Sequence, residues 1–271
     1  MTLMALVLIQ AVDAQDYPQF VSHFPGDLTN DSLVGADDLM ALLAVFGTDY
    51  VALLPPNCED DVVFDFEGYS YELVSIGDQC WFAENLRTEH YANGDAIPGG
   101  LGESEWSSTT DGAQAIFGEG DGSEELNLAN YGRLYNWYAI GDERGLCPAG
   151  WMVPSDLDWI ELEMELGMSE MHANSLGYRG SGQGSLMKSS PADDPGWNGT
   201  NDSGFSGLPG GQRTKHGHYQ SSYGWWWTSS PTSWYGDLEA WRRTLYTDGE
   251  GVERLESSRS FGFSVRCVRD Y

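Results

Sequence analysis

Glycine and tryptophan constrain the fold of this chain more than any other feature of its sequence. The 271 residues include 34 Gly and 11 Trp, and aromatic residues make up 13% of the total. Glycine gives the backbone access to tight turns, whereas tryptophan buries a large apolar surface from a single position. This combination disfavours a helical bundle and predicts a loop-rich fold whose core is organised by large rings.

The chain is strongly acidic. It carries 42 Asp+Glu against 13 Lys+Arg, which gives a formal net charge of -29 at pH 7. A field of this sign repels nucleic-acid phosphates and anionic lipid, so neither is expected as a partner. Divalent cations and basic surfaces fit the charge better. Hydrophobic residues make up 41% of the chain, too many for a disordered acidic tail. No apolar stretch reaches the roughly 18 residues that a membrane span needs.

The first residues have the pattern of a secretory signal peptide. Residues 1–10 are largely apolar, and Val12-Asp13-Ala14 offers a small-residue cleavage site before Gln15. The segment contains no Lys or Arg, so a start further upstream and a buried N-terminal strand remain alternatives. We expect residues 1–14 to be a signal peptide, and the mature protein to be secreted or displayed on the cell surface.

Four cysteines are present: Cys58, Cys80, Cys147 and Cys267. None forms a Cys-x-x-Cys pair, so zinc binding and thioredoxin-like chemistry lack support. An even number of cysteines in an exported chain favours two disulfides. Three connectivities are possible, and we favour Cys58–Cys80 with Cys147–Cys267. The second bond would close the longer loop and contribute more stability in the chain-entropy description.

Residues 15–57 form a separate N-terminal segment with the pattern of a calcium loop. Such a loop supplies oxygen ligands from positions 1, 3, 5, 7, 9 and 12. Counted from the first aspartate, the ligands are Asp27, Thr29, Asp31, the Leu33 carbonyl, a water at Gly35, and Asp38. Apolar residues then follow at helical spacing, at Leu39, Leu42, Leu43 and Phe46.

This segment resembles the calcium loop and helix of a dockerin repeat, and the resemblance implies calcium as a cofactor. Two residues depart from the dockerin pattern: Thr29, and Ser32 where glycine usually makes the sharp turn. Only one loop is present, so the tandem pair that binds cohesin in dockerins is missing. The alternative is an acidic turn before an amphipathic helix. Residues 53–57 contain paired prolines and are expected to be a linker.

Several elements are expected in the remaining chain. Residues 62–66 and 69–76 have the composition of strands, joined by a turn at Glu67-Gly68. A helix is expected to start after Ser155, with Asp158 completing a capping box, and to end at Gly167. The other expectations are a short helix over 131–138, strands over 225–229, 240–246 and 261–268, and a long surface loop over 93–125. Residues 173–215 hold many Gly, Ser, Asp and Pro and show little periodicity.

Six motifs in order resemble the Fibrobacter succinogenes major paralogous domain. They lie at residues 71–86, 131–135, 147–159, 204–211, 224–229 and 262–270. The resemblance covers about residues 62–271, within a domain expected over residues 58–271. It implies an α+β fold related to C-type lectins and to the formylglycine-generating enzyme group. Such a fold has short antiparallel strands and two or three short helices. The family's biochemical role is largely unknown, so the resemblance indicates a fold more than a function.

Within this resemblance, residue roles can be assigned. Large rings are expected in the core at Trp81, Trp137, Trp151, Trp159 and Trp226, and tight turns at Gly77, Gly132, Gly150 and Gly210. Glu84, Asn85 and Arg133 are polar positions of the family. They are expected to form buried hydrogen bonds to loop backbone; a ligand role is the alternative.

No motif of a known enzyme class occurs in the chain. His-Glu-x-x-His, Gly-x-Ser-x-Gly and the phosphate-binding loop are all absent. The enzymatic fold relatives use a reactive cysteine pair, but a disulfide sulfur has no thiolate. His216 and His218 would lie on one side of an extended segment and could hold a metal, although a solvated loop is the simpler interpretation. We therefore expect a protein that is not an enzyme.

Binding is the expected function. Trp106, Trp197, Trp234, Tyr235 and Trp241 lie in polar or loop-like contexts and are candidates for exposed rings. The segment 193–202 places oxygen ligands beside an aromatic ring, so Trp197, Asn198, Asp202 and Trp234 are the candidate ligand residues. A structural acidic loop is the alternative, because the Glu-Pro-Asn type tripeptide of sugar-binding C-type lectins is absent.

The sequence thus predicts an exported, non-catalytic module for extracellular binding or for cell-surface and structural assembly. Its partner would be an extracellular protein, a second copy of the chain, or a glycan recognised through Trp- and Asp-rich loops. The run Trp225-Trp226-Trp227 is a candidate protein contact, because successive side chains of a strand point to opposite faces. Core packing against both faces of that strand is the alternative.

Overall fold

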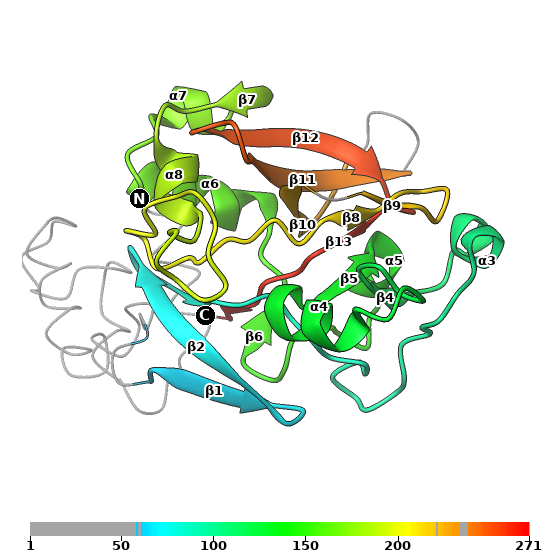
Figure 1. The fold of residues 1–271 in the computed structure, drawn as a ribbon. Coiled ribbons are helices and arrows are strands. Elements are labelled where there is room, and N and C mark those ends of the chain that lie inside the picture. Colours follow the sequence, from blue (N-terminus) through cyan, green and yellow to red (C-terminus); the bar gives the residue numbers. More distant parts are fainter. Residues whose placement is uncertain (1–57, 59–60, 221, 233–237, 271) are drawn as a thin grey trace, which may run out of the picture. The chain divides into compact units, whose positions relative to one another are not determined.

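The structure is a computed structural model, and it describes residues 58, 61–220, 222–232 and 238–270 (Figure 1). The chain divides into two compact units, residues 1–55 and residues 56–271. All of the described residues belong to the second unit. The predicted signal peptide, the calcium loop with its five protein ligands, and Trp234 lie outside the described residues.

Three antiparallel sheets form most of the regular structure. The first has the strand order β1-β2-β3-β14-β6. Its strands are β1 (Val63–Phe66), β2 (Tyr69–Ile76), β3 (Gln79–Phe82), β14 (Val268–Arg269) and β6 (Trp151–Met152). β1 and β2 form a hairpin whose turn residues, Glu67 and Gly68, have φ angles of 51° and 79°. A positive φ at both positions is typical of a two-residue hairpin turn. The predicted strands and turn are confirmed.

The second and third sheets complete the domain. One has the order β4-β5-β13-β8-β9 and the other the order β10-β11-β12-β7. The strands of the second sheet are β4 (Gln114–Ile116), β5 (Arg133–Asn136), β13 (Gly262–Phe263), β8 (Gln212–Arg213) and β9 (Tyr219–Gln220). Those of the third are β10 (Tyr223–Pro231), β11 (Glu239–Tyr246), β12 (Val252–Ser258) and β7 (Gly177–Arg179). β11 and β12 run side by side at the top of Figure 1.

The helices in the described part of the chain are short and lie between strands in the sequence. They are α3 (Glu103–Ser108), α4 (Glu124–Tyr131), α5 (Trp137–Ile140), α6 (Asp156–Glu165), α7 (Glu170–Ala173) and α8 (Gln183–Met187). α6 begins as predicted: Ser155 Oγ accepts from the Asp158 amide, and the Asp158 carboxylate accepts from the Ser155 amide. Gly167 follows its end with a φ of 92°. No helix in the described residues is long and apolar enough to cross a membrane.

Some predictions about the elements are wrong. The expected helix over 131–138 is instead the end of α4, the strand β5 and the start of α5. Gly132 causes this break: its φ is 70°, and a Cβ there would lie 2.8 Å from the Leu86 carbonyl oxygen. The expected strand over 261–268 is divided into β13 and β14, which belong to different sheets. The expected loop 93–125 contains α3 and β4, and the segment 173–215 contains β7, α8 and β8.

The core is built from rings, as predicted. Trp81, Trp137, Trp151, Trp159 and Trp226 are all buried. Trp81, Trp159, Trp226 and Phe205 form one cluster with ring centroids 5.2–6.4 Å apart, mostly edge to face. Buried aromatic pairs of this kind contribute about 0.5–1.5 kcal/mol each beyond the area that they bury.

Residues 225–227 pack into the core on both faces of their strand, which is the alternative given for them above, and the candidate protein contact is absent. Trp225, Trp226 and Trp227 are 7%, 0% and 0% exposed. Trp225 and Trp227 contact Phe263 of β13, whereas Trp226 contacts Trp159 of α6. Because β10 is covered on both faces, the three rings form a core contact and offer no surface to a partner.

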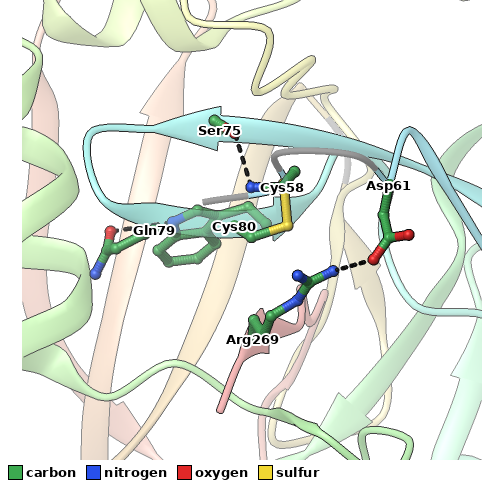
Figure 2. The surroundings of a disulfide bond; sticks show 7 residues. Cys58, Asp61, Ser75, Gln79, Cys80 and Arg269 are labelled. Atoms are coloured by element: carbon green, nitrogen blue, oxygen red, sulfur yellow. Dashed lines mark hydrogen bonds and ion pairs between the residues drawn. A yellow bond between two sulfur atoms is a disulfide. The ribbon is translucent and has the colours of Figure 1, made fainter. Parts of the chain in front are cut away.

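Two disulfides join Cys58 to Cys80 and Cys147 to Cys267, the pairing favoured from the sequence. Figure 2 shows the first bond beside the β2–β3 hairpin, where the Cys58 amide donates to Ser75 Oγ at 3.0 Å. Arg269 of β14 reaches Asp61 at 2.9 Å in the same region. The second bond joins the segment before β6 to the residue before β14.

Candidate functional site

The acidic loop 193–202 follows α8, and much of its polar chemistry is used within the loop. Asp193 Oδ2 accepts from the Ser190 amide at 2.7 Å and from Asn201 Nδ2 at 3.0 Å. The backbone hydrogen bond from Ser190 lowers the pKa of Asp193 below its usual range. Asp202 is exposed and accepts from Thr200 Oγ1 at 2.9 Å. These contacts support the interpretation of this segment as a structural acidic loop.

Trp197 and Asn198, in contrast, point out of this loop toward the turn between β11 and β12. Trp197 Nε1 donates to Thr247 Oγ1 at 3.3 Å, and Asn198 Nδ2 donates to the Thr247 carbonyl oxygen. Thr247 Oγ1 in turn donates to the carbonyl oxygen of Ser222, at the start of β10. Three segments far apart in the sequence are thus joined by a chain of hydrogen bonds.

These segments surround a hollow of about 530 Å³, which we call the aromatic hollow. Its lining residues are Tyr131, Trp197, Pro209, Ser222, Tyr223, Thr247 and Asp248. The three rings are partly exposed, whereas most other aromatic rings among the described residues are buried. A concave, mostly apolar surface with a few polar groups is typical of a ligand site.

Neighbouring contacts hold the three rings in place. Tyr223 packs edge to face against Tyr246 at 4.7 Å and against Trp225 at 5.4 Å. The Lys188 ammonium lies 5.2 Å from the Trp197 ring centroid, a favourable cation–π distance. Tyr131 is the last residue of α4, and its carbonyl oxygen accepts from Asn85 Nδ2 at 2.8 Å.

Lys188 and Ser222 show that this hollow has unusual local chemistry. Lys188 is 2% exposed and donates to the carbonyl oxygens of Tyr246 and Gly249 at 3.1 and 2.8 Å. Its burial lowers the pKa of the ammonium. Ser222 has a φ of 97°, a conformation that L-residues rarely adopt. Backbone strain of this kind is often found beside functional sites.

Of the other candidate rings, Trp234 and Tyr235 lie outside the described residues, Trp106 is buried, and Trp241 has a face covered by an arginine. Trp106 is 1% exposed and donates from Nε1 to the Ser260 carbonyl oxygen, so its predicted exposure is wrong. The ring of Trp241 is stacked against the Arg254 guanidinium at 3.9 Å. The predicted ligand residues are therefore only partly brought together. Trp197 lines the hollow, Asn198 donates to the lining residue Thr247, and Asp202 does not line the hollow.

Three predicted polar positions act as structural groups. Asn85 Oδ1 accepts from Trp226 Nε1 at 2.8 Å and from Arg266 Nε at 3.1 Å. Arg133 donates to the Arg87 carbonyl oxygen at 2.9 Å. Glu84 accepts from the Glu72 amide at 2.8 Å, and burial raises the pKa of its carboxyl.

No group of three or more His, Cys, Asp or Glu side chains that could hold a metal ion occurs among the described residues. His216 and His218 lie in the turn between β8 and β9, where Gly217 has a φ of 87°. The expected extended segment is therefore absent, and His218 Nδ1 lies 3.1 Å from Glu103 Oε1 instead. The predicted calcium ligands lie outside the described residues.

Sequence reasoning missed a buried network of charges beneath the third sheet. Glu163 of α6 accepts from Arg179 and from Arg243 Nε at 3.0 and 2.6 Å, and Asp156 accepts from Arg243 and Arg254 at 2.7 and 2.6 Å. A signal was available, because Glu163 lies four residues after Trp159 and therefore shares its buried helix face. Tyr131, Tyr223 and Thr247 of the aromatic hollow carried no such local signal.

Comparison with protein families identifies the domain. The Fibrobacter succinogenes major domain matches residues 74–269, from β2 to β14. Comparisons with curated proteins and with solved structures found no match. The family match covers well over half of the chain and includes the second and third sheets and, apart from β1 and the start of β2, the first sheet. This protein therefore belongs to the Fibrobacter succinogenes major domain family.

Proposed function

We propose that this protein is an exported, non-catalytic binding module whose ligand is a carbohydrate held in the aromatic hollow. The observation that carries the proposal is the arrangement of Tyr131, Trp197 and Tyr223 around one open hollow. Aromatic faces cover the apolar C–H faces of sugar rings, while polar groups at the edge orient the hydroxyls. Ser222, Thr247 and Asp248 supply such groups.

The hollow is held in shape before any ligand arrives. The hydrogen bonds from Trp197 to Thr247 and from Thr247 to Ser222 connect its three walls. A site that is already ordered loses less conformational entropy on binding, which favours affinity. The relationship to C-type lectins is part of this proposal, and it rests on the sequence motifs.

Export and the absence of catalysis are supported by the sulfur chemistry. All four cysteines are joined in disulfides, which persist in oxidising compartments outside the cytosol. Disulfide sulfurs have no thiolate, so the cysteine chemistry of the enzymatic fold relatives has no counterpart here.

The proposed N-terminal calcium segment would stabilise or attach the module. Calorimetric calcium titration of the wild type should give a binding heat, and Asp31→Ala should abolish it. Equal binding heats for the wild type and Asp31→Ala would contradict calcium binding by this segment.

The carbohydrate proposal can be tested with neutral oligosaccharides. Wild-type protein, Trp197→Ala and Tyr223→Ala should be titrated with oligosaccharides of β-glucan, xylan and mannan type. Loss of a central aromatic contact should weaken binding about tenfold or more. Tyr178→Ala is the matched control, because this tyrosine is 51% exposed and does not line the hollow. Binding that Trp197→Ala leaves unchanged would contradict the site, and no binding to any oligosaccharide would contradict the ligand class.

Self-assembly is the second candidate function, and one observation favours it. The segment from α6 to the entry of β7 carries four exposed apolar side chains: Leu157, Met164, Met171 and Leu176. Apolar groups gathered on a surface often mark a protein contact. Sedimentation without sugar tests this function: a mass that rises with protein concentration and falls in Met171→Asp would support assembly, and a constant monomer mass would exclude it.

A further inference from the structure

A second hollow, of about 460 Å³, opens beside α5. We call it the arginine hollow, and its polar lining includes Thr110, Asp111, Tyr138, Arg144 and Arg259. Two guanidinium groups in one hollow are unexpected in a chain with 13 basic residues and 42 acidic ones.

Arg259 differs from the other arginines of this protein. Each of the other ten donates at least one side-chain hydrogen bond to a described residue. The Arg259 guanidinium has neither a hydrogen bond nor an ion pair with any described residue, and its Nε is buried without a partner. A buried donor without an acceptor costs free energy, and such groups are rare in folded proteins. The two Nη groups also lack an acceptor among the described residues, but they are not buried, so a ligand in the hollow can reach them.

The guanidinium is nevertheless held in a defined place. Its central carbon lies 4.2 Å from the centroid of the Trp137 ring. Trp137 is 8% exposed and donates from Nε1 to the Thr228 carbonyl oxygen at 2.9 Å, so the ring is fixed. Stacking occupies a face of the guanidinium and Nε is buried, but the Nη–H groups at the outer edge stay open to the hollow. This planar fork matches the two oxygens of a carboxylate.

Arg144 does not compete for the same role. It donates to Asp142 at 2.8 and 2.7 Å and to Asp95 at 3.2 Å, and its guanidinium lies 3.9 Å from the Tyr91 ring centroid. The hydrogen bond from Arg144 lowers the pKa of Asp142 to about 2. Asp142 is therefore ionised, and the charge of Arg144 balances it. Arg259 is then the cation of this hollow that is open to a ligand.

We propose that the arginine hollow binds the carboxylate of a hexuronate, a sugar acid with one negative charge. Arg259 donates to both carboxylate oxygens. Asp111 is exposed, its carboxylate has no hydrogen bond to a described residue, and it accepts from a sugar hydroxyl. The hydroxyls of Thr110 and Tyr138 complete the polar lining. The net charge of -29 opposes polyanions at long range, so a single carboxylate among neutral hydroxyls fits better than an acidic peptide.

The experiment compares galacturonate with its neutral methyl ester. Each is titrated into wild-type protein while the Arg259 Nε–H resonance is followed by NMR. Galacturonate should shift this resonance and bind about tenfold or more tightly than the ester, because a charge-assisted hydrogen bond is lost in the ester. This comparison needs no variant, so it remains decisive even if a substitution disturbs folding. Equal affinity for acid and ester would overturn the proposal.

Variants then locate the site. Arg259→Gln should weaken galacturonate binding about tenfold or more, and Arg259→Lys should restore only part of it because the planar fork is missing. Arg269→Gln is the matched control: Arg269 also stacks on a tryptophan, 5.1 Å from the Trp151 ring, but it is paired with Asp61. Arg269→Gln should bind galacturonate with the same affinity as the wild type.

Two further outcomes separate this inference from the carbohydrate function of the aromatic hollow. Trp197→Ala should leave galacturonate binding intact. If Trp197→Ala loses galacturonate binding while Arg259→Gln keeps it, the site in the arginine hollow is overturned and a site in the aromatic hollow is favoured. Acetate that binds as tightly as galacturonate would overturn the assignment to a sugar acid.

Discussion

Arginine side chains form many of the buried hydrogen bonds and ion pairs of this domain. Six of the eleven arginines are buried: Arg133, Arg179, Arg213, Arg243, Arg254 and Arg266. Arg266 is 1% exposed; burial lowers its pKa to about 9, and it donates to the carbonyl oxygens of Phe82 and Phe205. Because the scarce cations lie inside, the surface of the domain is more acidic than the composition alone indicates.

The first prediction concerns Glu163, which is fully buried between two arginines. Glu163→Gln keeps the shape of the side chain but removes the charge that faces Arg179 and Arg243. Leaving buried cations uncompensated should lower the free energy of unfolding by about 3–5 kcal/mol. Urea unfolding followed by tryptophan fluorescence measures this loss. Glu165→Gln, at an exposed position of the same helix, is the control and should change stability by less than about 0.5 kcal/mol. Equal losses in the two variants would contradict the network's importance.

The second prediction concerns acid stability. Burial alone would raise the pKa of Asp156, but hydrogen bonds from Arg254 and Arg243 and their charges lower it below the usual 3.8. As pH falls, the unfolded state therefore takes up this proton first. The contribution of Asp156 is complete above about pH 4 and is lost as pH falls through the lower folded pKa. The difference in unfolding free energy between wild type and Asp156→Asn should shrink below about pH 4; a constant difference would contradict the lowered pKa.

At the scale of elements, α6 shows how a local signal and tertiary packing agree. Its capping box starts the helix, and Trp159 and Leu162 are both fully buried in the core. The same helix carries Asp156 and Glu163 into the charge network. A loosened first turn of α6 would therefore affect both the core and the buried charges.

The third prediction tests this cap. Ser155→Ala removes the oxygen that accepts from the Asp158 amide at 3.2 Å. The free energy of unfolding should fall by about 1 kcal/mol, within the usual range for such caps. Chemical denaturation checks the value, with Ser181→Ala as a control at an exposed position that does not cap α6. A loss in Ser155→Ala no larger than in the control would show that the cap is dispensable.

Segment 131–138 shows where local reasoning fails. Its aromatic residues are spaced as on a helix, yet Arg133–Asn136 form β5 because β4 and β13 supply hydrogen-bonding partners on both sides. Those partners lie about twenty and more than a hundred residues away in sequence. Propensity is a weak guide wherever a central strand position is available.

At the scale of the whole molecule, the disulfides close loops of very different length. The sequence separations are 22 for Cys58–Cys80 and 120 for Cys147–Cys267. The fourth prediction follows: replacing Cys147 and Cys267 by alanine should cost about 4–5 kcal/mol of unfolding free energy, against about 3 kcal/mol for Cys58 and Cys80. Denaturant unfolding of the two double variants measures both. A larger loss from the shorter loop would contradict the loop-entropy explanation.

The two proposed binding sites also belong to this scale, because each is built from distant segments. The aromatic hollow joins Tyr131, Trp197, Tyr223 and Thr247, and the arginine hollow joins Thr110, Tyr138 and Arg259. Trp197 was the one lining residue of the aromatic hollow that the sequence indicated. The other lining residues could not be predicted from the sequence, because strand pairing and loop packing bring them together and no local pattern marks them.

The sequence by itself determined the ring-rich core, the first hairpin, the start of α6, the favoured cysteine pairing and, through its motifs, the family. Each of these depends on residues near in the chain or on a recognisable order of motifs. Only the tertiary structure decided which rings are buried, which arginines are paired, and where hollows remain open. Those outcomes depend on which distant surfaces meet, and burial on both faces of a strand has no signature in that strand's own sequence.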